Sequence, residues 1–569
     1  MSVPTWLAAA RGDEPADLVL KGGTVINVFS GELESVDMAV KDGWIVGLGD
    51  YQGMEELDVS GKALAPGFID AHLHLESTMI APAELAKVVV PRGTTALIAD
   101  PHEIANVLGL RGIQYLIETT ADLPMDVFFM APSCVPATHL ETSGATLTAD
   151  DLAELAREPR VLGLAEMMNF PGVVHGFGDV WAKLEQFRDR VIDGHAPMVS
   201  GRDLNAYLAG GISTEHESST LEEAREKLAR GMYVFLREGT AARNLRDLIP
   251  LVNGHNYRRT AFCSDDRHPE DLVLRGHMDD ILRNAVALGM DPVRAVTMAT
   301  LNPAEAYGLK RRGALAPGYI ADIVVLNNLS GFEAETVIKN GRVVSAGREL
   351  NQEPVSSEIP AWAGPMNVRD LTADRFRLGV AGSKVNVIEL VPGQLVTNRL
   401  VEQTPQAEGK LIADTGRDLL LTAVVERHKG TGNVGLGLIK GLGLKQGALA
   451  GSVAHDSHNI VAAGVSAESL HRAVQAVIDM RGGLVVASDD GIVARLPLPL
   501  AGLMSDRPAH EVAQALTDLD EAASRLGCTL PNPFMALSFV ALPVIPSLKL
   551  TDQGLVDVVK FDFIPLVAD

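Results

Sequence analysis

Cysteine is scarce in this sequence, and its scarcity limits where the protein is expected to reside and how its fold is held together. The 569 residues include three cysteines, Cys134, Cys263 and Cys528, which lie far apart and are odd in number. This spacing offers no disulfide framework and suits a reducing compartment, so we expect a cytoplasmic protein. Cys263 falls within an apolar run and is better explained as a core residue than as a nucleophile.

Positive charge and long apolar runs are also in short supply. Lysine and arginine total 49 against 73 aspartates and glutamates, which gives a net charge of −24. Nucleic acids and anionic membranes both attract basic patches, so neither is expected as a partner. The sequence has no uninterrupted run of about 18 apolar residues that would predict a membrane span. The short apolar patch at residues 6–10 lacks the form of a signal peptide.

Apolar residues are plentiful and the chain is long. They make up 47% of the sequence, which is ample for a globular protein. A chain of 569 residues is too long for one hydrophobic core, so we expect two or three domains. The sequence has no repeat at a fixed period that would indicate a solenoid.

The most informative stretch is Asp70-Ala71-His72-Leu73-His74, which closes an apolar run typical of a short buried strand. Side chains alternate along a strand, so Asp70, His72 and His74 should point the same way. Two imidazoles with this spacing can bind one divalent metal, and a nearby carboxylate can orient an imidazole or neutralise the ion. Taken alone, the motif fits a polar strand end with incidental histidines better. The later strand ends reverse that preference.

Further strand-like runs end in side chains that can bind metals. In chain order these endings are Asp100 with His102 and Glu103, then Glu166, His195, His216, and Asp265 with Asp266. Helix-like stretches separate several of the runs, at residues 104–119, 180–190, 221–230 and 245–252. Strands and helices that alternate over roughly 250 residues predict an α/β fold with a (β/α)8 TIM-like barrel. In that fold the chemistry takes place at the carboxyl ends of the strands.

These features resemble the amidohydrolase superfamily, in which an HxH motif closes strand one, histidines follow strands five and six, and an aspartate follows strand eight. Many members bridge two metals with a carboxylated lysine after strand four, where this chain has Glu166. The glutamate at this position argues against a dihydroorotase or hydantoinase. It is similar to what the adenine deaminase family has there. The segments at residues 66–77, 99–107, 132–138 and 452–459 also resemble that family, so the likeness covers nearly the whole chain.

The resemblance implies that a purine base, adenine, is deaminated to hypoxanthine and ammonia by a hydroxide that bridges two divalent metals. The implied ligands are His72, His74 and Asp265 for one metal, His195 and His216 for the other, and Glu166 as the bridge. Asp265 would also act as general acid and base. Mixed nitrogen and oxygen ligands suit several metals, and the family likeness suggests Mn(II) or Fe(II).

A second acid must protonate the ring nitrogen beside the reacting carbon. Glu103, Asp100 and Glu76 are the candidates, because all lie at predicted strand ends or in the loops that follow them. We take Glu103 as the catalytic group and Asp100, Glu76 and His102 as substrate contacts, although His102 could also bind metal weakly. The competing interpretation for all four is ordinary hydrogen bonding within the loops.

Strand patterns divide the chain into parts. Short strand-like runs joined by glycine turns occur around residues 17–47 and again around residues 313–344. We expect residues 1–65 and 313–353 to pair into one small β domain that flanks the barrel, which spans residues 66–312. A proline-bearing linker at residues 354–365 should then lead to a carboxyl-terminal α/β domain at residues 366–569.

The carboxyl-terminal part contains two motifs. The stretch at residues 430–435 matches the GxGxxG pattern of dinucleotide sites, but glycines interrupt the helix that should follow, so we interpret it as a packing element. The second motif places His455, Asp456 and His458 close together. If this loop is functional, His455 and His458 would contact substrate from above the barrel mouth. The alternative is a solvated turn.

Two other functions are compatible with these motifs. A different amidohydrolase could use the same hydroxide on an amide or cyclic amide, and a non-catalytic scaffold could keep the barrel alone. The scaffold is disfavoured because such relatives are expected to lose metal ligands, whereas the implied ligands are all present here. We also expect a homo-oligomer.

Overall fold

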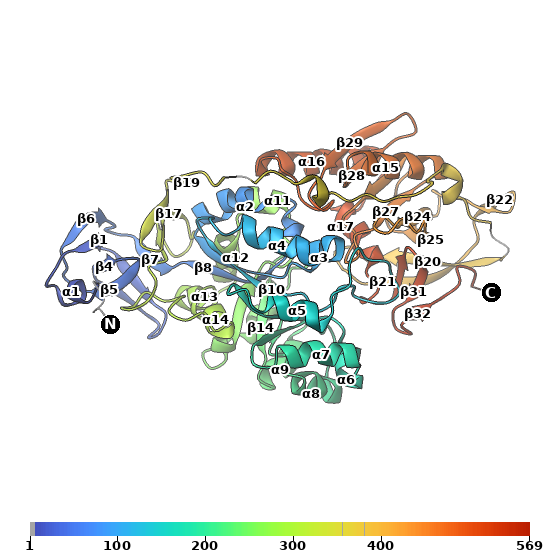
Figure 1. Ribbon diagram of the computed structural model, residues 1–569. Helices are drawn as coiled ribbons and strands as arrows, with labels where there is room; N and C mark the ends of the chain where they lie inside the picture. The colour runs from blue at the N-terminus through green and yellow to red at the C-terminus, as the bar shows by residue number, and fades with distance from the viewer. Residues whose placement is uncertain (1–5, 356, 380–381, 569) are drawn as a thin grey trace.

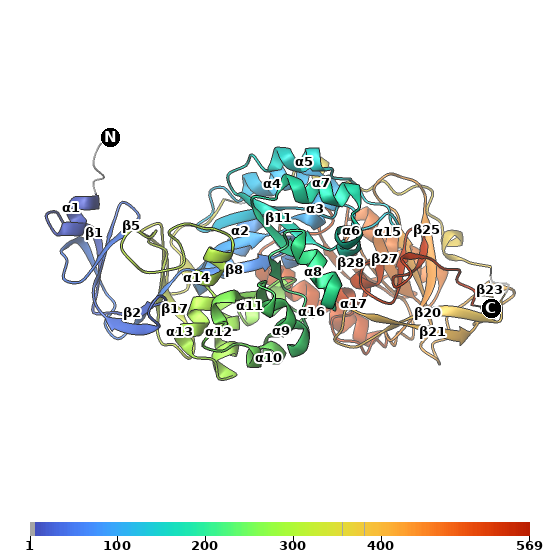
Figure 2. The same ribbon diagram turned by 90° about the horizontal axis from the view of Figure 1, so that it is seen from below.

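The computed structural model describes residues 6–355, 357–379 and 382–568. Figure 1 shows three parts in a row: small sheets at the amino-terminal end, a barrel in the centre, and a second large sheet domain beside the carboxyl terminus. Figure 2 shows the same order from below. Within the described part, no helix combines the length and apolarity that a membrane crossing requires.

Eight parallel strands form the central barrel. Five of them pair side by side: β8 (Phe68–Leu73), β9 (Thr94–Ala99), β10 (Asp126–Ala131), β11 (Val161–Met167) and β12 (Val191–Gly194). A second group contains β13 (Thr214–Glu215), β14 (Tyr233–Arg237) and β15 (Thr260–Cys263). A parallel bridge from Leu73 to Asp265 joins the end of β8 to the chain after β15. The predicted barrel is confirmed, and the carboxyl ends of its strands meet at one mouth.

Helices cover the outside of this barrel. They are α2 (Pro82–Val89), α3 (His102–Leu108), α4 (Leu110–Thr119), α5 (Ala149–Leu155), α6 (Phe170–His175), α7 (Gly178–Gln186), α8 (Gly201–Ala209), α9 (Leu221–Ala229), α10 (Leu245–Leu248), α11 (Pro269–Leu274), α12 (Met278–Ala287), α13 (Pro292–Met298) and α14 (Leu301–Ala306). The helix expected at residues 104–119 is in fact two helices. Gly109 separates them with a φ of 61°, a conformation that other residues adopt with strain.

Two sheets lie at the amino-terminal end. The first, of order β5-β4-β1-β6, contains β1 (Ala16–Lys21), β4 (Met38–Lys41), β5 (Trp44–Leu48) and β6 (Gly53–Asp58), and α1 (Trp6–Arg11) lies beside it. The second, of order β19-β18-β17-β16-β7-β2-β3, contains β2 (Thr24–Asn27), β3 (Glu32–Ser35), β7 (Ala63–Pro66), β16 (Ile323–Leu326), β17 (Ala334–Lys339), β18 (Arg342–Ala346) and β19 (Glu349–Leu350). Because β7 pairs with β16, the second sheet joins segments from before and after the barrel.

An eight-stranded sheet of order β21-β20-β25-β24-β27-β26-β28-β29 dominates the carboxyl-terminal part. Its strands are β20 (Lys384–Leu390), β21 (Thr397–Gln403), β24 (Leu420–Val425), β25 (Val434–Lys440), β26 (Ala448–Gly451), β27 (Ile460–Gly464), β28 (Gly483–Ala487) and β29 (Ile492–Pro497). The remaining elements are β22 (Gln406–Ala407), β23 (Lys410–Leu411), α15 (Ala467–Asp479), α16 (Ala509–Arg525), α17 (Pro533–Ser538), β30 (Leu548–Thr551), β31 (Gly554–Asp557) and β32 (Asp562–Phe563). The GxGxxG stretch links β24 to its antiparallel neighbour β25, so no helix follows it and the packing interpretation is confirmed.

One hydrophobic core extends from the barrel into the carboxyl-terminal domain. The same cluster of buried side chains contains Leu97 of β9 and Leu449 of β26. Hydrogen bonds cross the same boundary, since the Thr142 backbone N–H donates to Asp552 Oδ1 at 2.8 Å. Each fully buried aliphatic side chain stabilises the fold by about 1.5–3 kcal/mol. The barrel and the carboxyl-terminal domain are therefore firmly joined, and the candidate site lies where they meet.

Candidate metal centre and active-site cavity

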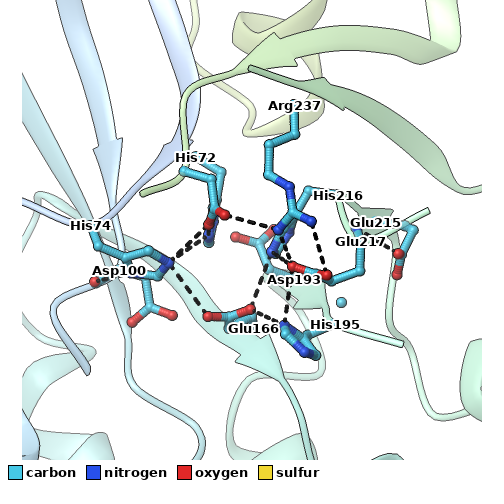
Figure 3. Close-up of polar contacts among 12 residues, drawn as sticks. His72, His74, Asp100, Glu166, Asp193, His195, Glu215, His216, Glu217 and Arg237 are labelled. Carbon is cyan, nitrogen blue, oxygen red and sulfur yellow. Dashed lines mark hydrogen bonds and ion pairs between the residues drawn. The ribbon is translucent and has the colours of Figure 1, made fainter. Parts of the chain in front are cut away.

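Histidine and carboxylate side chains converge at the barrel mouth (Figure 3). His72 near the end of β8 and His74 just after it place their Nε2 atoms 3.3 Å apart, and both rings are buried. His74 Nδ1 lies 3.1 Å from the backbone oxygen of Asp100. Because a carbonyl oxygen only accepts hydrogen bonds, a bond here requires the proton on Nδ1. The lone pair of His74 Nε2 is then directed at the neighbouring ligand atoms.

Glu166 on β11 lies between histidines on two sides. Its Oε2 atom is 2.6 Å from His195 Nδ1 and 3.2 Å from His216 Nε2. Its Oε1 atom is 3.6 Å from His74 Nε2 and 3.5 Å from His102 Nδ1. Burial alone would raise the pKa of Glu166, but the adjacent His195 and His216 imidazoles hold this pKa well below its usual range. The side chain is thus an ionised carboxylate with each oxygen turned to a different pair.

Asp265 lies two residues beyond the end of β15, the barrel's last strand. Its Oδ1 atom is 3.1 Å from His74 Nε2 and 3.5 Å from His72 Nε2. Its Oδ2 atom accepts a hydrogen bond from Arg237 Nη1 at 2.9 Å. Burial would raise the pKa of Asp265, but the charge of Arg237 and the bonds from the two histidines hold it well below its usual range. This carboxylate is therefore ionised and fixed in orientation.

These side chains fit divalent metal ions. Ligand atoms lie within 4.8 Å of one another in five groups of the described residues. Two of these groups are His72 with His216 and Asp265, and Glu166 with His195 and His216. His216 Nε2 makes no well-aligned hydrogen bond to any residue in the described ranges, although it lies 3.2 Å from Glu166 Oε2. A buried ring nitrogen without a partner is costly, and a metal ion would satisfy it. The nitrogen and oxygen donors suit Zn, Mn or Fe.

Asp70 has a different role from the two histidines that follow it. Its carboxylate accepts a hydrogen bond from the Ser264 backbone N–H at 3.0 Å and lies 2.9 Å from His277 Nε2. The alternation of side chains along β8 places Asp70 on the same face as the histidines, but one step deeper in the barrel. Its carboxylate therefore ties β8 to the chain after β15 and does not orient the rings of the HxH motif.

Glu103, the predicted second acid, lies in the first turn of α3. It lines the cavity, and its Oε1 atom accepts a hydrogen bond from Ser77 Oγ at 2.9 Å. Burial, together with the nearby Glu76 and Asp266 carboxylates, raises the pKa of Glu103 well above its usual range. This shift favours the protonated form of Glu103, which can donate a proton.

The other three candidates around Glu103 are placed differently from one another. His102 lines the cavity, and its Nδ1 atom lies 3.1 Å from Asp100 Oδ2. Glu76 Oε1 accepts a hydrogen bond from the Ile104 backbone N–H at 2.9 Å. Asp100 and Glu76 are not among the described residues that line the cavity. Contact of these two carboxylates with substrate therefore stays a prediction.

Two residues of the carboxyl-terminal domain face this part of the barrel. His455 Nδ1 lies 3.4 Å from Glu103 Oε1, and Asp456 Oδ1 lies 3.7 Å from His102 Nε2. Both His455 and Asp456 line the cavity. His458 lies behind His455, with ring centroids 5.5 Å apart, and is not among the described lining residues. The loop does reach the barrel mouth, and only part of the predicted histidine pair faces the cavity.

The remaining carboxyl-terminal lining is apolar. Leu395, Phe539, Leu542 and Ile545 line the cavity together with the metal-binding side chains. The Phe539 ring stacks on the His455 ring with centroids 4.4 Å apart and an interplanar angle of 16°. Aromatic and aliphatic surfaces with a few polar groups are typical of sites that bind flat heterocycles.

Sequence reasoning missed two polar residues of the lining, Glu217 and Arg237. Arg237 Nη2 donates a hydrogen bond to Glu217 Oε2 at 3.1 Å, while its Nη1 atom reaches Asp265. Glu217 follows His216 directly, so its place after β13 was a usable signal. Arg237 ends β14, a strand that was not recognised because it does not end in a typical metal ligand.

Comparison with known proteins gives a consistent result. Residues 63–344 match the amidohydrolase family, and residues 394–562 match the adenine deaminase C-terminal domain. The chain is 48% identical over 563 residues to an adenine deaminase of Desulfatibacillum aliphaticivorans, covering 98% of this chain and 99% of that protein. It is 47% identical over 569 residues to an adenine deaminase of Methanothrix thermoacetophila, covering 100% of both. A solved dihydropyrimidinase from Brevibacillus agri aligns at 14% identity and a TM-score of 0.46, covering 59% of this chain and 96% of that one.

Proposed function

The chain belongs to the adenine deaminase family of amidohydrolases, and from this premise we propose that it hydrolyses adenine to hypoxanthine and ammonia at two divalent metal ions. One observation supports the two-metal arrangement above all. Glu166 turns Oε2 toward His195 and His216, and Oε1 toward His74 and His102. A carboxylate between two groups of ring nitrogens can bridge two neighbouring cations, the task that a carboxylated lysine performs in many amidohydrolases.

The proposed ligands are His72, His74 and Asp265 for one ion, His195 and His216 for the other, and Glu166 for both. When bound, such ions supply an activated water, because coordination lowers its pKa toward neutrality. His216 is grouped with His72 and Asp265 and also with Glu166 and His195. This shared position is compatible with closely spaced ions.

Asp265 and Glu103 divide the proton transfers between them. The ionised Asp265 would accept a proton from the water that attacks C6 of adenine, while Glu103 would protonate the neighbouring ring nitrogen. Asp265 would then return its proton to the amine, and the bond from C6 to the exocyclic nitrogen would break to release ammonia. The proton left on the C6 hydroxyl would pass to Glu103, which restores that acid and leaves the C6 carbonyl of hypoxanthine. The opposite pKa shifts of the two carboxyl groups suit an ionised base and a protonated acid at the same pH.

The other predicted contacts would act around the purine ring. We assign His102 and His455 to direct contact, because both line the cavity. Asp100 would hold His102 through their 3.1 Å contact, and His458 would support His455 from behind. Glu76 would fix the start of α3, because it accepts a hydrogen bond from the Ile104 backbone N–H.

The family and the grouped ligand atoms support the use of divalent metals. Following the family likeness, we propose Mn(II) or Fe(II) as the native ions. A homo-oligomer and a cytoplasmic location stay predictions. So does the division into residues 1–65 with 313–353, residues 66–312, and residues 366–569.

An ammonia-release assay tests the proposal. Protein supplied with Mn(II) or Fe(II) should release ammonia from adenine, and release it poorly from adenosine, guanine and cytosine. Dihydroorotate and hydantoin should not be hydrolysed, because those activities belong to the alternative of a cyclic-amide hydrolase. Turnover of either cyclic amide without turnover of adenine would replace the proposal with that alternative. A metal content near zero in protein purified without chelator would favour a scaffold.

A further inference from the structure

A second, outer cavity adjoins the candidate active site. It lies between barrel loops and the carboxyl-terminal domain, and its lining includes Met198, Arg243, Asn244 and Val396. The inner cavity with the metal-binding side chains and this outer cavity have four lining residues in common: Glu217, Arg237, Leu395 and Ile545. These four residues therefore lie at the boundary between the two spaces, where a passage from one to the other would run.

The polar side of this passage is fixed by charge. Arg237 is buried, donates to both Glu217 and Asp265, and is thereby held in one orientation. The other side is apolar and consists of Leu395 and Ile545 from the carboxyl-terminal domain. A molecule that moves from the outer to the inner cavity must pass between these two sides.

Hydrogen bonds join the two chain segments that carry Leu395 and Ile545. The Thr397 backbone N–H donates to the Pro546 oxygen at 3.0 Å, and the Ser547 backbone N–H donates back to the Thr397 oxygen at 3.0 Å. Lys549 Nζ donates to the backbone oxygen of Leu395 at 3.0 Å. The spacing between Leu395 and Ile545 is therefore set by the fold, so that the passage is preorganised.

The positions of C6 and N9 in adenine determine which substituents this passage would exclude. If C6 of adenine faces the metal ligands, the opposite edge of the purine, which includes N9, points away from them. If that edge faces the apolar side of the passage, a ribose at N9 would meet Leu395 and Ile545, whose side chains offer no hydrogen bonds to its hydroxyl groups. Leaving such groups unpaired is costly.

We infer that Leu395 and Ile545 form a selectivity constriction, through which a free purine base enters from the outer cavity and which rejects adenines substituted at N9. The inference rests on the proposed function, because it assumes that adenine is the substrate. It assigns substrate selection to two apolar residues that do not take part in the proposed proton transfers or metal binding.

The test compares adenine with 9-methyladenine and adenosine in variants of the constriction. Leu395→Ala and Ile545→Ala should each raise the ratio of kcat/KM for 9-methyladenine to that for adenine by about tenfold, since a methyl-sized change in an apolar pocket has effects of this order. Leu395→Trp should lower kcat/KM for adenine by narrowing the passage. Metal content should be unchanged in all three variants.

A neighbouring residue supplies a matched control. Val396 lines only the outer cavity, so Val396→Ala should leave the ratio unchanged. An unchanged ratio in both Leu395→Ala and Ile545→Ala would overturn the constriction, as would an equal rise in Val396→Ala. Equilibrium dissociation constants for adenine and 9-methyladenine provide the same comparison without turnover. A protein that binds adenine selectively but releases no ammonia would refute the proposed function and leave the constriction supported.

Discussion

The barrel and the carboxyl-terminal domain contribute different chemistry to the inner cavity. The barrel side carries ionisable groups, among them Glu103, Glu166 and Asp265, whereas the carboxyl-terminal side is mostly apolar, with His455 and Asp456 as its polar members. On the barrel side, neighbouring charges drive the pKa values of individual carboxyl groups apart. Proton transfer and metal binding are thus concentrated on one side, and recognition and exclusion of water on the other. Variants of the two sides should therefore fail in different ways.

The largest effect is expected on the barrel side, at Asp265. Asp265→Asn removes the proposed proton acceptor, so kcat for adenine should fall by about 10²–10⁴-fold, the range for a lost general acid or base. Steady-state kinetics with metal analysis measure this effect. Asp247→Asn, at an exposed aspartate that lines the outer cavity, serves as the control. A metal-replete Asp265→Asn enzyme with nearly normal kcat would rule out the shuttle.

The second effect concerns the carboxylate between the histidine groups. Glu166→Gln should weaken metal affinity by at least about 10–100-fold, the cost typical of losing even an outer partner of a metal site, because a neutral amide bridges two cations poorly. Metal content after dialysis and ammonia release measure the two consequences. Glu154→Gln on α5 changes an exposed glutamate in the same way and should be silent. Full metal occupancy together with a normal rate in Glu166→Gln would remove the bridging role.

The same contrast explains what the sequence could and could not predict. The barrel side was accessible because chelating residues recur at strand ends, as His72, Glu166 and His195 illustrate. Two strands, β10 and β14, were not singled out because neither ends in a typical metal ligand, and Arg237 was lost with β14. Arginine has no lone pair with which to bind a metal, so a strand that ends in arginine gives no such signal.

The apolar side could not be predicted by this route. Leu395, Phe539 and Ile545 are ordinary hydrophobic residues on segments far apart in the sequence, and only the folded chain brings them to one cavity. Histidine crowding did identify the loop with His455, but spacing alone could not tell that His458 would lie behind it. Side-chain direction in a loop depends on backbone conformation, and His458 adopts a φ of 54°.

The third prediction tests the carboxyl-terminal side directly. His455→Ala removes a ring that contacts Glu103 and stacks on Phe539, so kcat/KM for adenine should fall by about tenfold with metal content unchanged. His139→Ala, at an exposed histidine, is the matched control. Normal kinetics in His455→Ala would show that the loop only covers the cavity. Truncation is a poor substitute for these variants, because barrel and carboxyl-terminal side chains share one core.

The smallest effect on turnover is expected at Lys549, which lies behind the apolar side. Its buried Nζ donates to the backbone oxygens of Leu395 and Phe539 at 3.0 and 2.8 Å, and burial lowers the pKa of Lys549 to about 7. In the unfolded chain the pKa of a lysine is about 10.4, so between pH 7 and pH 10 the unfolded state binds the proton that the native state has released. The free energy of unfolding should therefore rise with pH by about 1.4 kcal/mol per unit in the wild type, relative to Lys549→Met.

Denaturant titrations of both proteins at several pH values in this range measure the difference in slope. Lys445→Met removes an exposed lysine that also donates to a backbone oxygen, and it should leave the slope of the wild type unchanged. Parallel slopes for wild type and Lys549→Met would mean that Lys549 keeps its proton in the folded state. A buried positive charge would then lie directly behind the apolar side of the cavity. The difference in charge between the barrel side and the carboxyl-terminal side would be smaller than their lining residues indicate.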